Sequence, residues 1–125
     1  LVEVRRHPGE DGGLVISWNE LASRIADWDE FIARYPGTPE AEKARKDFCG
    51  KYLYIYLNGT DNTPLYDLET GRLKPEVKES YEAFMENHED SGAYQAVKEY
   101  YDILKSSGFM ATDDAREYAS ELNRN

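Results

Sequence analysis

The residues of this sequence that could carry catalytic chemistry are two histidines, one cysteine and 25 acidic residues. We expect His7, in a turn rich in glycine and proline, to be solvated, and His88, at a predicted helix end, to pack against its neighbours. A serine or cysteine nucleophile needs a histidine placed to take its proton, and no motif around either histidine indicates one. Cys49 interrupts no helical pattern and is typical of a small buried residue.

Sites for metals and phosphates are not indicated either. A single cysteine excludes a zinc site built from several thiolates. Asp61, Asp67 and Glu69 are close in sequence, but their spacing differs from that of a calcium-binding loop, and Gly71 is misplaced for one. No glycine-rich phosphate loop is recognisable. We therefore predict no catalytic, cofactor-binding or metal-binding residues, and we expect that the chain is not an enzyme.

The charge balance narrows the class of partner. Fifteen basic and 25 acidic residues give a formal net charge of −10 and a pI of about 4.6. Nucleic acids and anionic membranes are bound through basic patches, so we expect neither as a partner. No apolar run approaches the roughly 20 residues of a membrane span, so we predict no direct membrane insertion. The acidic surface is compatible with a basic partner, although a merely solubilising surface is the simpler interpretation.

The elements that must position any site are predicted to be helices. Five segments carry apolar residues at helical spacing behind a capping residue or a first-turn proline. They begin at Ser17, Thr38, Pro75, Ser91 and Thr112, and the stop signals are Pro36-Gly37, Asn58-Gly59 and Gly108. We predict an all-α fold of about five helices arranged as antiparallel helical hairpins. Residues 17–125 would form this domain, and residues 1–16 an N-terminal arm or a short hairpin between 1–4 and 14–16.

Residues 51–57 leave an alternative open. The run Lys-Tyr-Leu-Tyr-Ile-Tyr-Leu alternates with period two and has high strand propensity. An α+β fold with a small hairpin at 51–68 is therefore the alternative. Helix is favoured because the helical pattern of Ala41, Ala44 and Phe48 runs in from upstream, although Gly50 weakens it.

The segment 58–74 is rich in turn signals. It also contains four large hydrophobic residues, Leu65, Tyr66, Leu68 and Leu73. We therefore predict a loop that packs onto the domain and not a free linker.

The sequence indicates one helical hairpin used twice, with an offset of 53 residues. The aligned pairs share chemical class: Trp28/Tyr81, Asp29/Glu82, Phe31/Phe84, Ile32/Met85, Thr38/Ser91, Ala44/Val97 and Phe48/Tyr101. In the first copy an aromatic closes one helix, Tyr35-Pro36 makes the turn, and Ala41 and Ala44 open the next helix. Small alanines at this spacing let two helices approach closely.

This segment, residues 31–44, resembles the motif that joins consecutive repeats in tetratricopeptide-like proteins of the bacterial envelope, among them outer-membrane lipoproteins. The resemblance implies a helical-repeat fold, protein binding, and a periplasmic or envelope location with a lipid anchor on a segment missing here. The chain departs from the family in two ways. Its period is 53 instead of about 34, which the segment 58–74 would explain, and the second copy has His88-Glu89 where the first has Tyr35-Pro36.

The resemblance favours a non-catalytic module that binds a partner protein or peptide on a tyrosine-rich helical face. Ten tyrosines against four phenylalanines is an unusual ratio, and tyrosine suits positions with one apolar and one wet end. The candidate partner-binding residues are Tyr52, Tyr54, Tyr56, Tyr66, Tyr94, Tyr100 and Tyr101. We expect about half of those on the helices to be buried for structural reasons.

Two other functions remain open at this stage. One is a small-ligand or glycan-binding domain with a pocket under the loop 58–74, near Tyr66 and Asp67. The other is a structural domain of a larger protein, since the chain begins with leucine, as a processed or trimmed fragment would. A cytoplasmic location is the alternative to the envelope.

Overall fold

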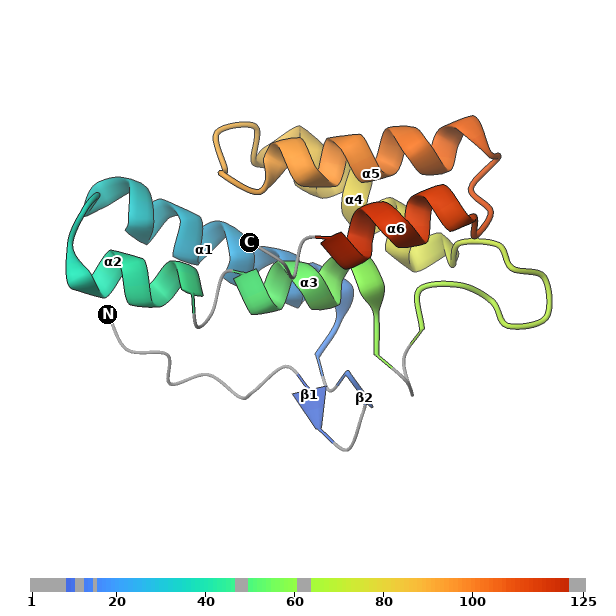
Figure 1. Cartoon of the computed structure of the whole chain (residues 1–125), viewed down its shortest axis with the longest axis horizontal. Helices are drawn as coiled ribbons and strands as arrows, with labels where there is room; N and C mark the ends of the chain where they lie inside the picture. Colours follow the sequence, from blue (N-terminus) through green and yellow to red (C-terminus); the bar gives the residue numbers. More distant parts are fainter. Residues whose placement is uncertain (1–8, 11–12, 15, 47–49, 61–63, 122–125) are drawn as a thin grey trace.

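Helices make up nearly all regular structure in the part of the chain that the computed structural model describes, residues 9–10, 13–14, 16–46, 50–60 and 64–121. They are α1 Trp18–Arg34, α2 Pro39–Ala44, α3 Gly50–Asn58, α4 Pro75–Asn87, α5 Tyr94–Ser106 and α6 Asp113–Glu121 (Figure 1). Two short antiparallel strands, β1 Gly9–Glu10 and β2 Gly13–Leu14, precede them, with Gly9 opposite Leu14. The predicted all-α class is confirmed.

The helices form two antiparallel hairpins, α1–α2 and α4–α5, joined through contacts between α1 and α4 (Figure 1). Helix α3 packs against α1, and α6 packs against both α3 and α5. The contacts α1–α3, α3–α6, α6–α5, α5–α4 and α4–α1 therefore close a ring around one core. A solenoid differs from this ring, because each of its repeats contacts only its neighbours in sequence.

Tyrosines occupy the centre of that core. The Tyr56 and Tyr81 rings meet edge to face at 4.9 Å, and the Tyr81 and Tyr100 rings lie 6.0 Å apart. All three side chains are buried. Their hydroxyls are bonded inside the protein: Tyr81 donates to the Tyr56 carbonyl (2.6 Å), Tyr56 shares a hydrogen bond with Ser80 (2.7 Å), and Tyr100 shares one with Tyr66 (2.6 Å). Buried polar groups are tolerated when they are bonded in this way.

These tyrosines should make the fold sensitive to alkali. Burial raises the pKa of Tyr56, Tyr81 and Tyr100 above the usual value, and burial with the nearby Glu82 carboxylate raises the pKa of Tyr101 to about 12. The unfolded chain loses these protons near pH 10, and the folded chain holds them. The stabilisation is therefore complete below about pH 10 and is lost as pH rises through the folded-state pKa values. We expect helical circular dichroism to disappear together with the rise of tyrosinate absorbance. Full tyrosinate absorbance with unchanged helicity would contradict this.

Most helix boundaries follow the predicted caps. The hydroxyls of Ser17, Thr38 and Thr112 accept hydrogen bonds from backbone N–H groups three residues on, at 3.0, 3.1 and 3.2 Å. Pro39 and Pro75 occupy the first position of α2 and α4, where a missing N–H costs nothing. Gly108 has a φ of +71°, the left-handed conformation expected at a helix end.

The helix predicted from Thr38 to Asn58 is divided in two. Helix α2 ends at Ala44, a wider π-type turn follows at Arg45 and Lys46, and α3 begins at Gly50. A Cβ at Gly50 would lie 3.3 Å from the Arg45 carbonyl oxygen, so the backbone approaches itself closely where no side chain is present. Glycine also disfavours a continuous helix.

The alternative hairpin at 51–68 is wrong, because Gly50–Asn58 is helical. Several further predictions lie outside the described residues. They concern the side chains of His7, Phe48 and Cys49 and the residues 1–4, predicted as one arm of an N-terminal hairpin; Leu14, in the other arm, lies opposite Gly9.

The loop 58–74 packs onto the helices, as predicted for most of its hydrophobic residues. Leu65 and Leu73 are buried and Tyr66 is half-buried, but Leu68 is 87% exposed. Tyr66 and Leu73 form an antiparallel bridge, and the Leu73 N–H donates to the Phe109 carbonyl at 2.8 Å. Leu68 is exposed because it lies in the tight turn that follows Tyr66.

Candidate functional site

The seven tyrosines proposed from the sequence do not share one surface. Tyr52, Tyr56 and Tyr100 are buried, whereas Tyr54, Tyr66, Tyr94 and Tyr101 are half-buried. The structure brings Tyr56, Tyr66 and Tyr100 together through Tyr81, inside the core. Tyr101 donates its hydroxyl to Glu82 at 2.6 Å. Tyr94, the first residue of α5, adjoins the turn that joins α4 to α5.

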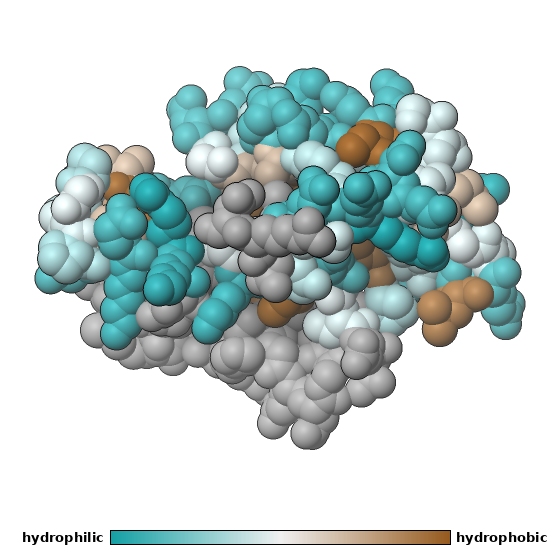
Figure 2. Space-filling view, in the orientation of Figure 1, coloured by the Kyte–Doolittle hydropathy of each residue, from teal (hydrophilic) through white to brown (hydrophobic). Residues whose placement is uncertain are grey.

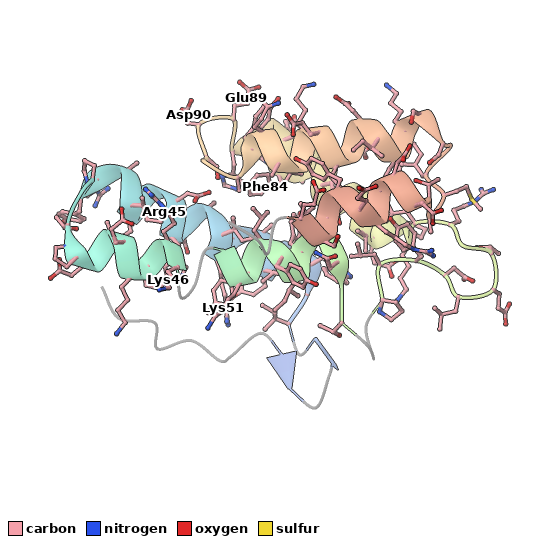
Figure 3. All side chains as sticks on the ribbon, in the orientation of Figure 1. Arg45, Lys46, Lys51, Phe84, Glu89 and Asp90 are labelled. Atoms are coloured by element: carbon pink, nitrogen blue, oxygen red, sulfur yellow. The ribbon has the colours of Figure 1, made fainter. Side chains whose placement is uncertain are left out.

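A cleft of about 380 Å³ lies beside this turn, between it and α1. On α1 the cleft is lined by Ala26, Asp27, Asp29, Glu30 and Ala33, and on the other side by residues 87–91. Figure 3 shows Glu89 and Asp90 on the turn, above the level of α1. The cleft therefore lies between the two helical hairpins, and each hairpin supplies one wall.

Equivalent helix ends build the two hairpins. Tyr35 ends α1 with φ −126° and ψ 56°, and His88 ends α4 with φ −134° and ψ 45°. Each donates its N–H to the carbonyl four residues earlier, Phe31 for Tyr35 (3.1 Å) and Phe84 for His88 (2.9 Å). This correspondence at an offset of 53 residues supports the internal repeat. At His88 the non-helical φ and ψ angles end α4, and the chain turns beside the cleft.

The hydroxyl that follows each turn is used differently. Thr38 caps α2, as predicted, but the corresponding Ser91 does not cap α5, which begins at Tyr94 with Ala93 before it. Ser91 donates its hydroxyl to the Asp29 carboxylate of α1. The prediction of Ser91 as the helix cap is therefore corrected: a carboxylate from the other hairpin binds this hydroxyl.

Negative charge dominates the cleft. Its lining contains five carboxylate side chains, Asp27, Asp29, Glu30, Glu89 and Asp90. Glu30 forms an exposed ion pair with Arg34 (2.9 Å), one helical turn away. Within the described residues, no three His, Cys, Asp or Glu side chains are grouped closely enough to hold a metal ion. Carboxylates spread along a cleft suit a long cation better, such as a lysine or arginine side chain.

The histidine and the serine of the cleft both contact other groups of the protein. His88 packs its ring against Phe84 at 5.2 Å, and Ser91 bonds to Asp29. With these contacts, Ser91 and His88 are not paired as a nucleophile and its base. The cleft can bind a ligand through its negative charge and its shape. Figure 2 shows hydrophilic side chains along the edge of the molecule formed by α5, next to the cleft.

Sequence reasoning missed the cleft for a plain reason. Its carboxylates belong to two segments about 60 residues apart, and acidic residues are too frequent in this chain for any pair to stand out. One signal was available: in the internal repeat, Asp29 aligns with Glu82 and Ser91 aligns with Thr38. The alignment shows that Asp29 and Ser91 occupy repeat positions.

No family model, curated protein or solved structure matches this chain. The resemblance of residues 31–44 to tetratricopeptide-like envelope proteins therefore stays a prediction. Among the described helices, none is both long enough and apolar enough to cross a membrane.

Proposed function

We propose that this chain is a non-catalytic protein–protein interaction module that binds a basic segment of its partner in the cleft between α1 and the α4–α5 turn. The observation that carries the proposal is the cleft itself, whose two walls present carboxylates from different hairpins. A cationic side chain between the walls would face negative charge on both sides.

Two features favour a peptide segment as the ligand. The alanines at 26 and 33 leave space along α1, and the volume of about 380 Å³ lies near the lower end of the range for ligand sites, about 300–1,000 Å³. The net charge of −10 would also speed the approach of a basic partner. Tyr94, half-buried beside the turn, is the tyrosine best placed to contact such a partner.

We place the module in a bacterial envelope protein, exposed to the periplasm. This part of the proposal is supported by the resemblance of residues 31–44 and by the two structurally equivalent hairpin turns at Tyr35 and His88. Fractionation of the source cells tests this location: we expect the full-length protein in the envelope or periplasmic fraction. Recovery in the cytoplasmic fraction would contradict it.

Calorimetric titration with a short oligolysine peptide tests the binding proposal. We expect the double variant Glu89→Gln/Asp90→Asn to bind about 5- to 30-fold more weakly, since each partly exposed charge contact contributes about 0.5–1 kcal/mol. Wild-type affinity should fall as salt is added.

The matched control is Glu117→Gln/Glu121→Gln, which removes the same charge from exposed positions on α6. We expect it to bind nearly as well as the wild type. Equal weakening by both double variants would show general charge attraction and would contradict a defined site.

A further inference from the structure

The Asp29 carboxylate bonds the first hairpin to the second at the cleft. Asp29 of α1 accepts hydrogen bonds from the Ser91 hydroxyl and from the Ala93 N–H (3.1 Å). The Ser91 oxygen accepts from the same Ala93 N–H at 3.1 Å, so the three groups form a closed cluster, here called the Asp29 clasp. The turn fits closely on this carboxylate, because a Cβ built at Gly92 would lie 3.6 Å from an Asp29 oxygen.

The clasp fixes the segment that carries one wall of the cleft. Glu89 and Asp90 lie one and two residues before Ser91, on an exposed turn. The backbone hydrogen bonds across the turn are local: Ser91 N–H donates to the His88 carbonyl (3.0 Å) and Tyr94 N–H to the Ser91 carbonyl (3.1 Å). Such local bonds shape the turn but do not place it relative to α1. The bonds to Asp29 do so, together with the burial of Ala93 in the core.

The repeat shows that this use of the carboxylate is particular to the first hairpin. Glu82, the counterpart of Asp29, accepts from Tyr101 of its own hairpin and pairs with Lys78 on α4 (3.3 Å). Asp29 instead reaches the following hairpin. Asp29 and Glu82 carry the same charge, but Asp29 bonds to the other hairpin and Glu82 bonds within its own.

The geometry points to Asp29 as a positioning residue that holds Glu89 and Asp90 over the cleft, so that closure of the clasp and binding of a basic segment strengthen each other. This inference rests on the proposed function and deepens it. A peptide bound to both walls holds the turn against α1, and a closed clasp keeps the second wall in place for the peptide. Such coupling is reciprocal by thermodynamic necessity.

The test uses Ser91→Ala, which weakens the clasp without removing any charge from the cleft. We expect this variant to bind oligolysine about 5-fold more weakly, at the low end of typical coupling. In the wild-type protein, saturating oligolysine should slow hydrogen exchange of the Ala93 amide, which donates to Asp29. A merely structural role for the clasp would lower stability, would leave the affinity for oligolysine unchanged, and would slow exchange at Ala93 no more than the general stabilisation by a bound ligand does.

The control is Ser107→Ala. Ser107 is also half-buried, and its hydroxyl donates to the Leu104 and Met110 carbonyls (3.0 and 3.1 Å) away from the cleft. It should bind oligolysine as the wild type does. Unchanged affinity of folded Ser91→Ala, or unchanged exchange at Ala93, overturns the inference even if Glu89→Gln/Asp90→Asn still weakens binding. If that double variant also binds normally, the proposed function itself fails.

Discussion

Replacing Tyr81 by alanine is expected to lower the free energy of unfolding by about 3–5 kcal/mol, the cost typical of emptying a buried aromatic site. Tyr81 has no exposed surface and contacts the rings of Tyr56 and Tyr100. It also lies on α4, which packs on both α1 and α5, so the cavity would open at the junction of the two hairpins. Because domains of this size are stable by about 5–15 kcal/mol, this loss is a large fraction of the total.

Tyr81→Phe separates packing from hydrogen bonding. It keeps the ring but removes the donor to the Tyr56 carbonyl (2.6 Å), and we expect a cost of about 1–3 kcal/mol. Urea unfolding followed by circular dichroism measures both variants. If Tyr81→Ala cost no more than Tyr81→Phe, the edge-to-face tyrosine core described above would be wrong.

Ala44→Leu is expected to cost about 1–3 kcal/mol through overpacking. Ala44 is 2% exposed and belongs to α2, which packs against α1. A leucine there would enter the space that the small side chain leaves for the close approach of the two helices.

Lys43→Leu provides the comparison for this substitution. Lys43 is exposed on the same helix, so the same residue type is introduced without overpacking, and we expect a change within about 0.5 kcal/mol. Thermal unfolding of both variants measures the difference. Equal stability of the two variants would contradict the packing of α2 onto α1.

Local signals in the sequence predicted the helix ends well. Ser17, Thr38 and Thr112 cap helices because their hydroxyls reach N–H groups only three residues away. The apolar stripe of α1 is also a local pattern: Leu21, Ile25 and Trp28 are buried, whereas Tyr35 at its end is 47% exposed.

Features that depend on distant contacts were not predictable in the same way. The ring closes because α6 packs on α3, and no pattern within either helix specifies that pairing. The Asp29 clasp joins residues 62 and 64 positions apart, so Ser91 could be interpreted from sequence only as a local cap. The sequence also predicted one helix from Thr38 to Asn58, whereas α2 ends at Ala44 and α3 begins at Gly50; glycine lowers helix propensity but does not by itself end a helix.

For the candidate site, too, local features were predictable from the sequence and contacts between distant residues were not. The tyrosine content predicted side chains with one apolar and one wet end, but Tyr56 and Tyr100 are buried and their hydroxyls bond to other hydroxyls inside the protein. Composition cannot distinguish a polar partner inside the core from water outside it. The cleft, in contrast, is lined by exposed and half-buried residues that come together only because the two hairpins meet.

The most direct measurement is a nuclear magnetic resonance titration of the isotope-labelled protein with oligolysine. The proposed function predicts that the largest amide shift changes occur at residues 26–33 of α1 and at residues 87–91, which supply the two walls of the cleft. Changes spread evenly over acidic residues of all helices, or confined to another surface, would contradict binding in the cleft.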